Sequence, residues 1–118
     1  GASRLDLLVA GPGPPAYLEL KSVTLAVGDE ARFPDAPTAR GVRHLRELMR
    51  AAREGVGAAV IFVAQRPDVR RFSPNDSTDP AFGEALRRAA DGGVRVMAYR
   101  CRVSLSAVTL ADPVPVIM

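Results

Sequence analysis

The sequence predicts an α/β fold in which a run of β-strands is followed by helices that alternate with further strands. Three features carry this prediction. Polar and apolar residues alternate partly over Arg4–Val9 and again over Tyr17–Leu25, a pattern typical of strands. The apolar residues then recur with a helical period over Thr38–Glu54. A continuous apolar run, Ala58–Ala64, follows and is typical of a strand covered on both faces.

The first strands are expected to form a three-stranded meander. Gly11-Pro12-Gly13-Pro14-Pro15 interrupts regular structure between the two alternating segments, which makes them the arms of a hairpin. Gly28-Asp29-Glu30 is expected to be the next turn. Ala31–Phe33 then forms a short third strand that ends at Pro34.

The segment Thr38–Glu54 is expected to be an amphipathic helix. Thr38 is a suitable N-cap residue, and Gly55 and Gly57 end the helix. The apolar face consists of Val42, Leu45, Leu48, Met49 and Ala52. Residues three and four apart share a side of a helix, so a basic stripe lies opposite, made of Arg43, Arg46, Arg50 and Arg53.

The second half of the chain continues the alternation of strands and helices. Ala58–Ala64 is placed at the centre of the sheet, and Gln65-Arg66 marks its carboxyl end. A loop with Pro67, Pro74, Asn75 and Asp76 leads to a helix over Pro80–Asp91, capped by Asp79 and ended by Gly92-Gly93. Val94–Arg100 is the next strand, and Val103–Leu110 is expected to form a last edge strand.

Length and composition favour one globular domain over residues 1–118, with 47% hydrophobic and 25% charged residues. Val56–Ala64 is far shorter than the roughly 20 residues of a membrane span, and no leader pattern precedes it, so no membrane association is expected. The lone cysteine, Cys101, suits a core position in the reducing cytoplasm. Because the chain begins without Met, we expect a segment of a longer protein.

Lys21 stands out among the basic residues. The chain has 16 Lys and Arg residues against 13 acidic ones, a net charge of +3, and Lys21 is the one lysine. A chain rich in arginine retains lysine where it needs a compact ammonium group, since guanidinium differs in shape and pKa. The alternative is an ordinary surface lysine.

Glu19 and Lys21 are two residues apart on a strand and therefore point to the same side of the sheet. A hairpin centred between Pro12 and Gly13 places Asp6 opposite Glu19, with Cβ atoms about 5 Å apart. Two facing carboxylates repel each other unless a cation lies between them. Asp6, Glu19 and the main-chain carbonyl of Leu20 provide oxygen ligands that suit Mg²⁺ or Mn²⁺.

This arrangement fits the hydrolysis of phosphodiesters. A divalent cation lowers the pKa of a bound water and offsets charge on the phosphate, while Lys21 positions the nucleophile or steadies the phosphorus centre. The alternative is a solvated strand face, on which Asp6 forms a surface salt bridge with Arg4 or Lys21.

Several segments, which follow one another in the same order over nearly the whole chain, resemble the sugar fermentation stimulation protein family. They are Ser3–Asp6, Tyr17–Leu25, Phe33–Ala36, Thr38–Gly41, His44–Leu48, Phe72–Pro74, Asp79, Gly93-Val94, Ala98-Tyr99 and Pro113–Val116. The resemblance implies a C-terminal domain with a restriction-endonuclease-like core, similar to the PD-(D/E)xK nucleases. It also implies that Asp6 is the first acidic position, that Glu19 and Lys21 are the E-x-K element, and that the protein binds DNA and is linked to sugar-utilisation genes. The family's N-terminal OB-like module and the helix that usually opens the nuclease core are not part of the resemblance.

Further residues are candidates for contact with DNA. Arg40 can clamp a phosphate or bridge to Asp35. His44, expected at the margin of the helix face, can contact phosphate or a metal-bound water, or serve as an ordinary structural histidine. The stripe of Arg43, Arg46, Arg50 and Arg53 can follow a DNA backbone, or pair with Glu47 and Glu54 as a solvated face. Gln65 and Arg66 lie where the central strand ends, and Gln65 can orient water.

Two functions from different classes follow. The first is a metal-dependent deoxyribonuclease that uses Asp6, Glu19 and Lys21 with Mg²⁺ or Mn²⁺. The second is a non-catalytic, non-specific DNA-binding or regulatory module that keeps the same scaffold. A third, structural interpretation treats the acidic pair as a cation-stabilised feature of an interaction domain.

Overall fold

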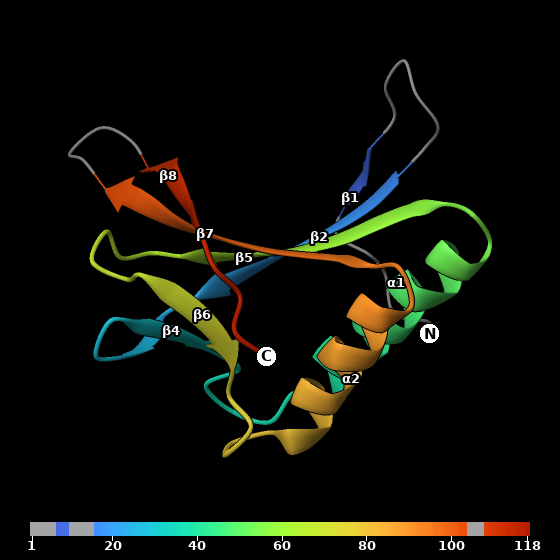
Figure 1. Cartoon of the computed structure of the whole chain (residues 1–118), viewed down its shortest axis with the longest axis horizontal. Coiled ribbons are helices and arrows are strands. Elements are labelled where there is room, and N and C mark those ends of the chain that lie inside the picture. Colours follow the sequence, from blue (N-terminus) through green and yellow to red (C-terminus); the bar gives the residue numbers. More distant parts are fainter. Residues whose placement is uncertain (1–6, 10–15, 104–107) are drawn as a thin grey trace.

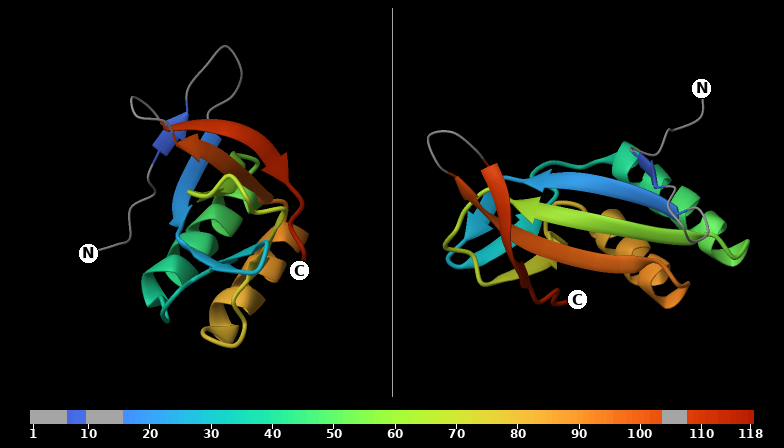
Figure 2. Two further views of the ribbon diagram at one scale, coloured as in Figure 1. Left: turned by 90° about the vertical axis from the view of Figure 1, so that its left-hand side faces the viewer. Right: turned by 90° about the horizontal axis from the view of Figure 1, so that it is seen from above.

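The computed structural model of the chain describes residues 7–9, 16–103 and 108–118, which form two sheets and two helices (Figure 1). The larger sheet has the order β1 (Leu7–Val9), β2 (Ala16–Val23), β5 (Gly57–Ala64), β7 (Arg95–Val103) and β8 (Val108–Val114). The smaller sheet has the order β3 (Leu25–Val27), β4 (Glu30–Phe33) and β6 (Arg71–Pro74). The helices α1 (Ala39–Arg53) and α2 (Pro80–Asp91) lie side by side against one face of the larger sheet (Figures 1 and 2). The predicted α/β class is confirmed.

Strand pairing in the larger sheet follows the connections between its strands. β1 is antiparallel to β2, with Leu7 opposite Leu18 and Val9 opposite Ala16, which is the register predicted for the hairpin. β2, β5 and β7 are parallel to one another, because each connection crosses over through a helix. β5 is the central strand of the five, as its apolar sequence predicts.

The predicted three-stranded meander is wrong. The alternating segment Tyr17–Leu25 is two strands in different sheets, because β2 ends at Val23 and β3 begins at Leu25. β4 pairs with β3 and with β6, so it belongs to the smaller sheet. β6 lies in the segment predicted to be a loop. Its four residues end in Pro74 and are too few to display an alternating pattern.

Both helices begin at the predicted N-cap residues. Thr38 Oγ1 accepts a hydrogen bond from the amide of Gly41 at 2.9 Å, and Asp79 Oδ1 accepts one from the amide of Phe82 at 3.0 Å. The second carboxylate oxygen of Asp79 accepts the amide of Thr38 at 2.8 Å. A single buried carboxylate therefore fastens the amino ends of both helices to each other.

Four phenylalanines join the two sheets and the helices into one core. Phe62 of β5 stacks on Phe72 of β6 with ring centroids 4.2 Å apart. Phe33 of β4 lies 5.5 Å from Phe62 and 5.2 Å from Phe82 of α2. Edge-to-face and offset contacts at these distances are favourable between aromatic rings. The aromatic cluster therefore holds the smaller sheet against the helix-bearing face of the larger one.

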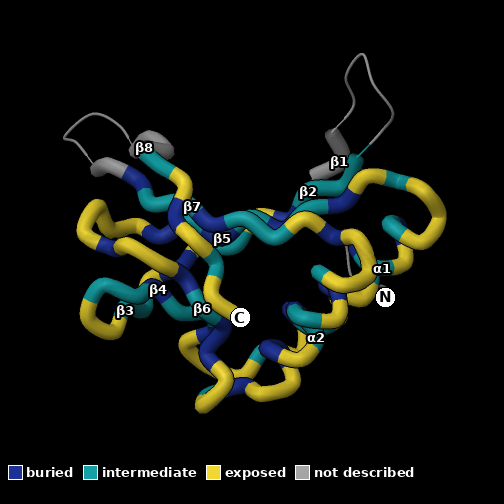
Figure 3. The backbone as a smooth tube through the Cα atoms, viewed as in Figure 1, coloured by how far each residue is buried: buried dark blue, intermediate teal, exposed yellow. Residues whose placement is uncertain are grey.

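The central strand is covered on one face and partly open on the other, so the expectation of two covered faces is wrong. Along β5 buried residues alternate with partly exposed ones (Figure 3). Val60 and Phe62 are fully buried, whereas Ile61 and Val63 are not. On the neighbouring strand Leu20 is 46% exposed.

Cys101 is buried, as predicted. In the part of the chain that the structure describes, no helix has the length and apolarity needed to cross a membrane.

Candidate functional site

Glu19 and Lys21 lie on the face of β2 that α1 covers. Their strand neighbours on β5 are Val60 and Phe62, two fully buried residues of that face. Alternation along β2 turns Leu20 to the opposite, open face. Glu19 is 1% exposed and Lys21 is 15% exposed in their side chains, and Lys21 Nζ lies 2.9 Å from Glu19 Oε1. The alternative interpretation of these residues as a solvated strand face is therefore wrong.

His44 of α1 completes this cluster. Its side chain is 1% exposed, and Nδ1 lies 2.8 Å from Glu19 Oε1 and 3.1 Å from Lys21 Nζ. A buried carboxylate is costly unless nearby charge compensates it, and here an ammonium and an imidazole both lie within 2.9 Å of the same oxygen, although neither meets hydrogen-bond geometry. We call Glu19, Lys21 and His44 the buried triad.

The buried position of His44 corrects its predicted one. The helix residues that are buried are Gly41, His44, Leu45, Leu48 and Ala51, whereas Val42, Met49 and Ala52 are only partly buried. The face that meets the sheet is thus turned by about one residue from the predicted apolar face. A buried imidazole cannot lie against a phosphate, so the direct DNA contact expected of His44 does not fit this position.

Asp6 lies outside the described residues. The register of Leu7 with Leu18 and of Val9 with Ala16 is the one from which its position opposite Glu19 was predicted. That position stays a prediction. Within the described ranges, no group of three or more His, Cys, Asp or Glu side chains is placed to hold a metal ion. The buried triad therefore provides one of the two predicted carboxylates.

Comparison with known proteins agrees with the resemblance seen in the sequence. Residues 1–107 match the family described as "Sugar fermentation stimulation protein RE domain". The chain belongs to this family. The sugar fermentation stimulation protein homologue of Moorella thermoacetica is 53% identical over 98% of this chain and 50% of its own length. That of Pelobacter propionicus is 48% identical over 98% of this chain and 50% of its own length.

A solved structure of the same family shares the fold. The structure of Pyrococcus furiosus SfsA in complex with Ca²⁺ is 34% identical in sequence, with a TM-score of 0.93. The match covers 100% of this chain and 52% of that one. The chain thus spans about half the length of the sugar fermentation stimulation proteins it matches, and the restriction-endonuclease-like arrangement predicted for it is consistent with this neighbour.

The predicted basic stripe lies on the exposed side of α1, opposite the buried triad. Arg43, Arg46, Arg50 and Arg53 are all exposed. Pairing with glutamates of the same helix was one alternative for this stripe. Among the described residues, no such ion pair is found for Arg46, Arg50 or Arg53. These three arginines are therefore available to a polyanion, and the use of the stripe stays a prediction.

The remaining candidates do not gather at the buried triad. Gln65 donates from Nε2 to Ser22 Oγ at 2.8 Å, and alternation along β2 places Ser22 on the face away from Lys21. Arg66 forms an ion pair of 2.7 Å with Asp68 and holds the pKa of that carboxyl below its usual value. Arg40 is exposed, and the described residues include no bridge from it to Asp35.

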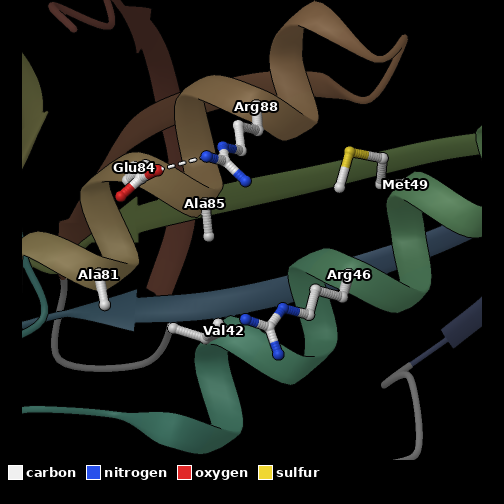
Figure 4. A pocket seen from close by; sticks show the side chains of 7 residues that line it. All are labelled: Val42, Arg46, Met49, Ala81, Glu84, Ala85 and Arg88. Atoms are coloured by element: carbon white, nitrogen blue, oxygen red, sulfur yellow. Dashed lines mark ion pairs between the residues drawn. The ribbon is translucent and has the colours of Figure 1, made fainter.

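A groove runs between α1 and α2 on the side away from the sheet (Figure 4). Its volume is about 160 Å³, and it is lined by Val42, Arg46, Met49, Ala81, Glu84, Ala85 and Arg88. Arg88 pairs with Glu84 across one helical turn at 2.6 Å. Val42 and Met49, which the sequence assigned to the core face, thus line this groove and are only partly buried against the core. The sequence signal for His44 was its spacing from Gly41 and Leu48, which places all three on one side of the helix.

Proposed function

We propose that the chain is a DNA-binding, nuclease-like domain that hydrolyses phosphodiester bonds with the help of a divalent cation. The observation that carries the proposal is the contact of 2.9 Å between Lys21 Nζ and Glu19 Oε1, made by the one lysine of the chain. A buried, charged pair costs free energy in a small domain, and such pairs are concentrated at functional sites. The resemblance of Asp6, Glu19 and Lys21 to the acidic and E-x-K positions of PD-(D/E)xK nucleases supports it.

In this proposal Asp6, Glu19 and the main-chain carbonyl of Leu20 hold Mg²⁺ or Mn²⁺. Carboxylate and carbonyl oxygens suit hard divalent cations, and Ca²⁺ is such a cation in the structure of Pyrococcus furiosus SfsA. Of these donors, the described residues supply Glu19 and the Leu20 carbonyl, which fit part of the ligand set. When bound, the cation supplies Lewis-acid activation of water and offsets charge on the phosphate.

In this proposal Glu19 and Lys21 have different roles in the reaction. Glu19 is held in one orientation by its contacts, so its carboxylate needs little reorganisation to bind. The side chain of Lys21 is 15% exposed, and in this proposal its ammonium group, beside Glu19, stabilises charge that develops on the phosphate. Burial of the pair excludes water and strengthens both effects.

DNA is held by its backbone in this proposal. The arginines Arg40, Arg43, Arg46, Arg50 and Arg53 are exposed on α1, and their forked guanidinium groups match phosphate oxygens. Few exposed aromatic side chains exist for base stacking, since the chain has no Trp and two Tyr, so binding is non-specific and weakens with salt. The lone cysteine suits a reducing compartment, and we place the protein in the cytoplasm.

A plasmid-nicking assay tests the catalytic part. Wild-type protein with Mn²⁺ should convert supercoiled DNA to the open-circle form, and Glu19→Gln and Lys21→Met should abolish conversion. Glu84→Gln, at an exposed position on α2, is the matched control and should nick as wild type does. DNA binding is measured on the same samples at two salt concentrations.

A second function is favoured by one observation. Glu19 receives its compensating charge from Lys21, so the buried triad is stable as an ion pair without a cation. A non-catalytic DNA-binding module of the same fold therefore remains the alternative. Retained, salt-sensitive binding by wild-type protein that does not nick DNA with Mg²⁺ or Mn²⁺ would establish this alternative and exclude the first.

A further inference from the structure

We infer that His44 is a positioning residue that fixes the Glu19 carboxylate through the close contact of Nδ1, as a donor, with Oε1. This inference rests on the proposed function, because the carboxylate it fixes is the proposed cation ligand. The ring and the carboxylate are each 1% exposed and lie 2.8 Å apart. His44 belongs to α1 and Glu19 to β2, so the contact joins a helix to the strand that carries the site.

The surroundings of the ring determine which nitrogen carries the proton. Glu19 Oε1 can only accept, and its 2.8 Å contact with Nδ1 falls short of hydrogen-bond geometry; a small rotation of the carboxylate lets Nδ1 donate to it. The other ring nitrogen, Nε2, is buried and has no hydrogen-bond partner among the described residues. The contact with the carboxylate therefore favours the tautomer with the proton on Nδ1.

This assignment also explains the position of Lys21. Its Nζ lies 3.1 Å from His44 Nδ1, a distance that would suit a hydrogen bond only if Nδ1 accepted. With the proton on Nδ1, both nitrogens are donors, and they are close because both reach Glu19 Oε1. Two nitrogens from different elements therefore lie within 2.9 Å of one carboxylate oxygen, and their contacts restrict its rotation more than either does alone.

The helix that holds the ring is itself fixed at its first turn. Thr38 caps α1, and the amide of Thr38 is held by Asp79 at 2.8 Å. His44 lies in the second turn, beside the fully buried Leu45 and Leu48 on the side that meets the sheet. The imidazole thus reaches Glu19 from a rigid support, as is required of a group that orients a ligand.

Two substitutions separate the hydrogen bond from the packing of the ring. In His44→Asn, the side-chain amide can occupy the place of Nδ1 and donate to Glu19, whereas His44→Leu fills similar space without a donor. We expect His44→Leu to weaken Mn²⁺ binding and nicking by roughly 10- to 100-fold, the usual effect of losing a group that orients a ligand. His44→Asn should retain most of both activities. Thermal unfolding of each variant confirms that it is folded.

A readout that does not depend on activity is available because the chain has one histidine. Long-range ¹H–¹⁵N spectra of the wild-type protein should show a proton on Nδ1 and none on Nε2, without any need for assignment. The Nδ1 proton should shift in Glu19→Gln. A proton found on Nε2 would overturn the inference at once.

The outcomes keep the two claims apart. If wild-type protein nicks DNA and both folded variants match it, His44 has no positioning role and the proposed function stands. Equal losses in the two folded variants would also overturn the inference, because they would show that packing of the ring matters rather than its donor. If wild-type protein neither binds Mn²⁺ nor nicks DNA, the proposed function fails and the positioning role fails with it. The spectra then still report whether the contact is made.

Discussion

Replacing Lys21 by Met should destabilise the domain strongly, and adding Glu19→Gln should restore much of the loss. In the wild-type protein, unit charges 2.9 Å apart attract each other by about 6 kcal/mol at an effective dielectric constant of about 20. Lys21→Met removes this attraction and leaves a carboxylate that is 1% exposed, with an expected cost of about 3–5 kcal/mol in the free energy of unfolding. Such a loss is a large part of the stability of a small domain.

Glu19→Gln alone should cost less, about 1–3 kcal/mol, because Lys21 is 15% exposed and its charge can be partly hydrated. In the double variant no charge is buried, and the side-chain carbonyl of the introduced glutamine can still accept a hydrogen bond from His44. We therefore expect the double variant to be more stable than Lys21→Met, with a coupling energy of about 2–4 kcal/mol from the double-mutant cycle. Urea unfolding at 25 °C in the presence of a chelator measures all four free energies.

An exposed pair of comparable length provides the control. Arg88 and Glu84 on α2 lie 2.6 Å apart, but their side chains are 71% and 64% exposed. The same cycle with Arg88→Met and Glu84→Gln should give a coupling energy of only about 0.3–0.5 kcal/mol. If the two cycles give equal coupling energies, or if the double variant at positions 19 and 21 is less stable than Lys21→Met, burial does not govern this pair and the reasoning is refuted.

Three further predictions concern the scaffold. Asp79→Ala removes the cap of α2 and the acceptor of the Thr38 amide, so it should lower the free energy of unfolding in urea by about 2–4 kcal/mol. Thr38→Ala removes only the cap of α1 and should lower it by about 1 kcal/mol. Equal losses would contradict the double role of Asp79. Phe62→Ala should lower the free energy of unfolding by about 3–5 kcal/mol, because Phe62 is fully buried between two sheets and a helix. A loss under about 1 kcal/mol would show that the aromatic cluster does not hold the two sheets together. Arg66 lowers the pKa of Asp68, so the pair stabilises the fold above the usual carboxyl pKa near 3.8, and this contribution is lost as pH falls through the lower folded-state pKa. Asp68→Asn should thus be slightly less stable than wild type at pH 7 and equal to it in acid, and a constant difference down to the lowest pH would contradict the linkage.

The helices could be predicted from sequence because their signals are local. A capping residue, a helical period and terminal glycines placed α1 and α2 almost to the residue. The register of β1 with β2 was also predictable, since it depends only on the centre of the loop between them. The pairing of Glu19 with Lys21 on one face follows from the period of a strand in the same way.

The features that sequence patterns failed to predict depend on contacts between distant parts of the chain. Nothing local separates Val23 from Leu25, yet they belong to different sheets, because the partners of β3 and β4 come from later in the chain. The uniformly apolar β5 does not tell which of its faces a helix will cover. His44 was misplaced because Val42 and Met49 are as apolar as the true core residues, although they face α2 and the groove. The contact of His44 with Glu19 could not be inferred before the packing of α1 on β2 was known.

Asp79, which joins the first turns of α1 and α2, allows residues far from Glu19 to affect the position of the buried triad. Helix α1 presents arginines to the surface and an imidazole to the interior, and its first turn is fastened to the neighbouring helix by one carboxylate. Loss of the hydrogen bond between the Thr38 amide and Asp79 allows α1 to shift as a rigid body, and such a shift also moves the imidazole of His44. Thr38 and Asp79 contact neither Glu19 nor a nucleic acid in this proposal. Substitutions at these positions should nevertheless weaken cation binding and nicking in protein that is still folded.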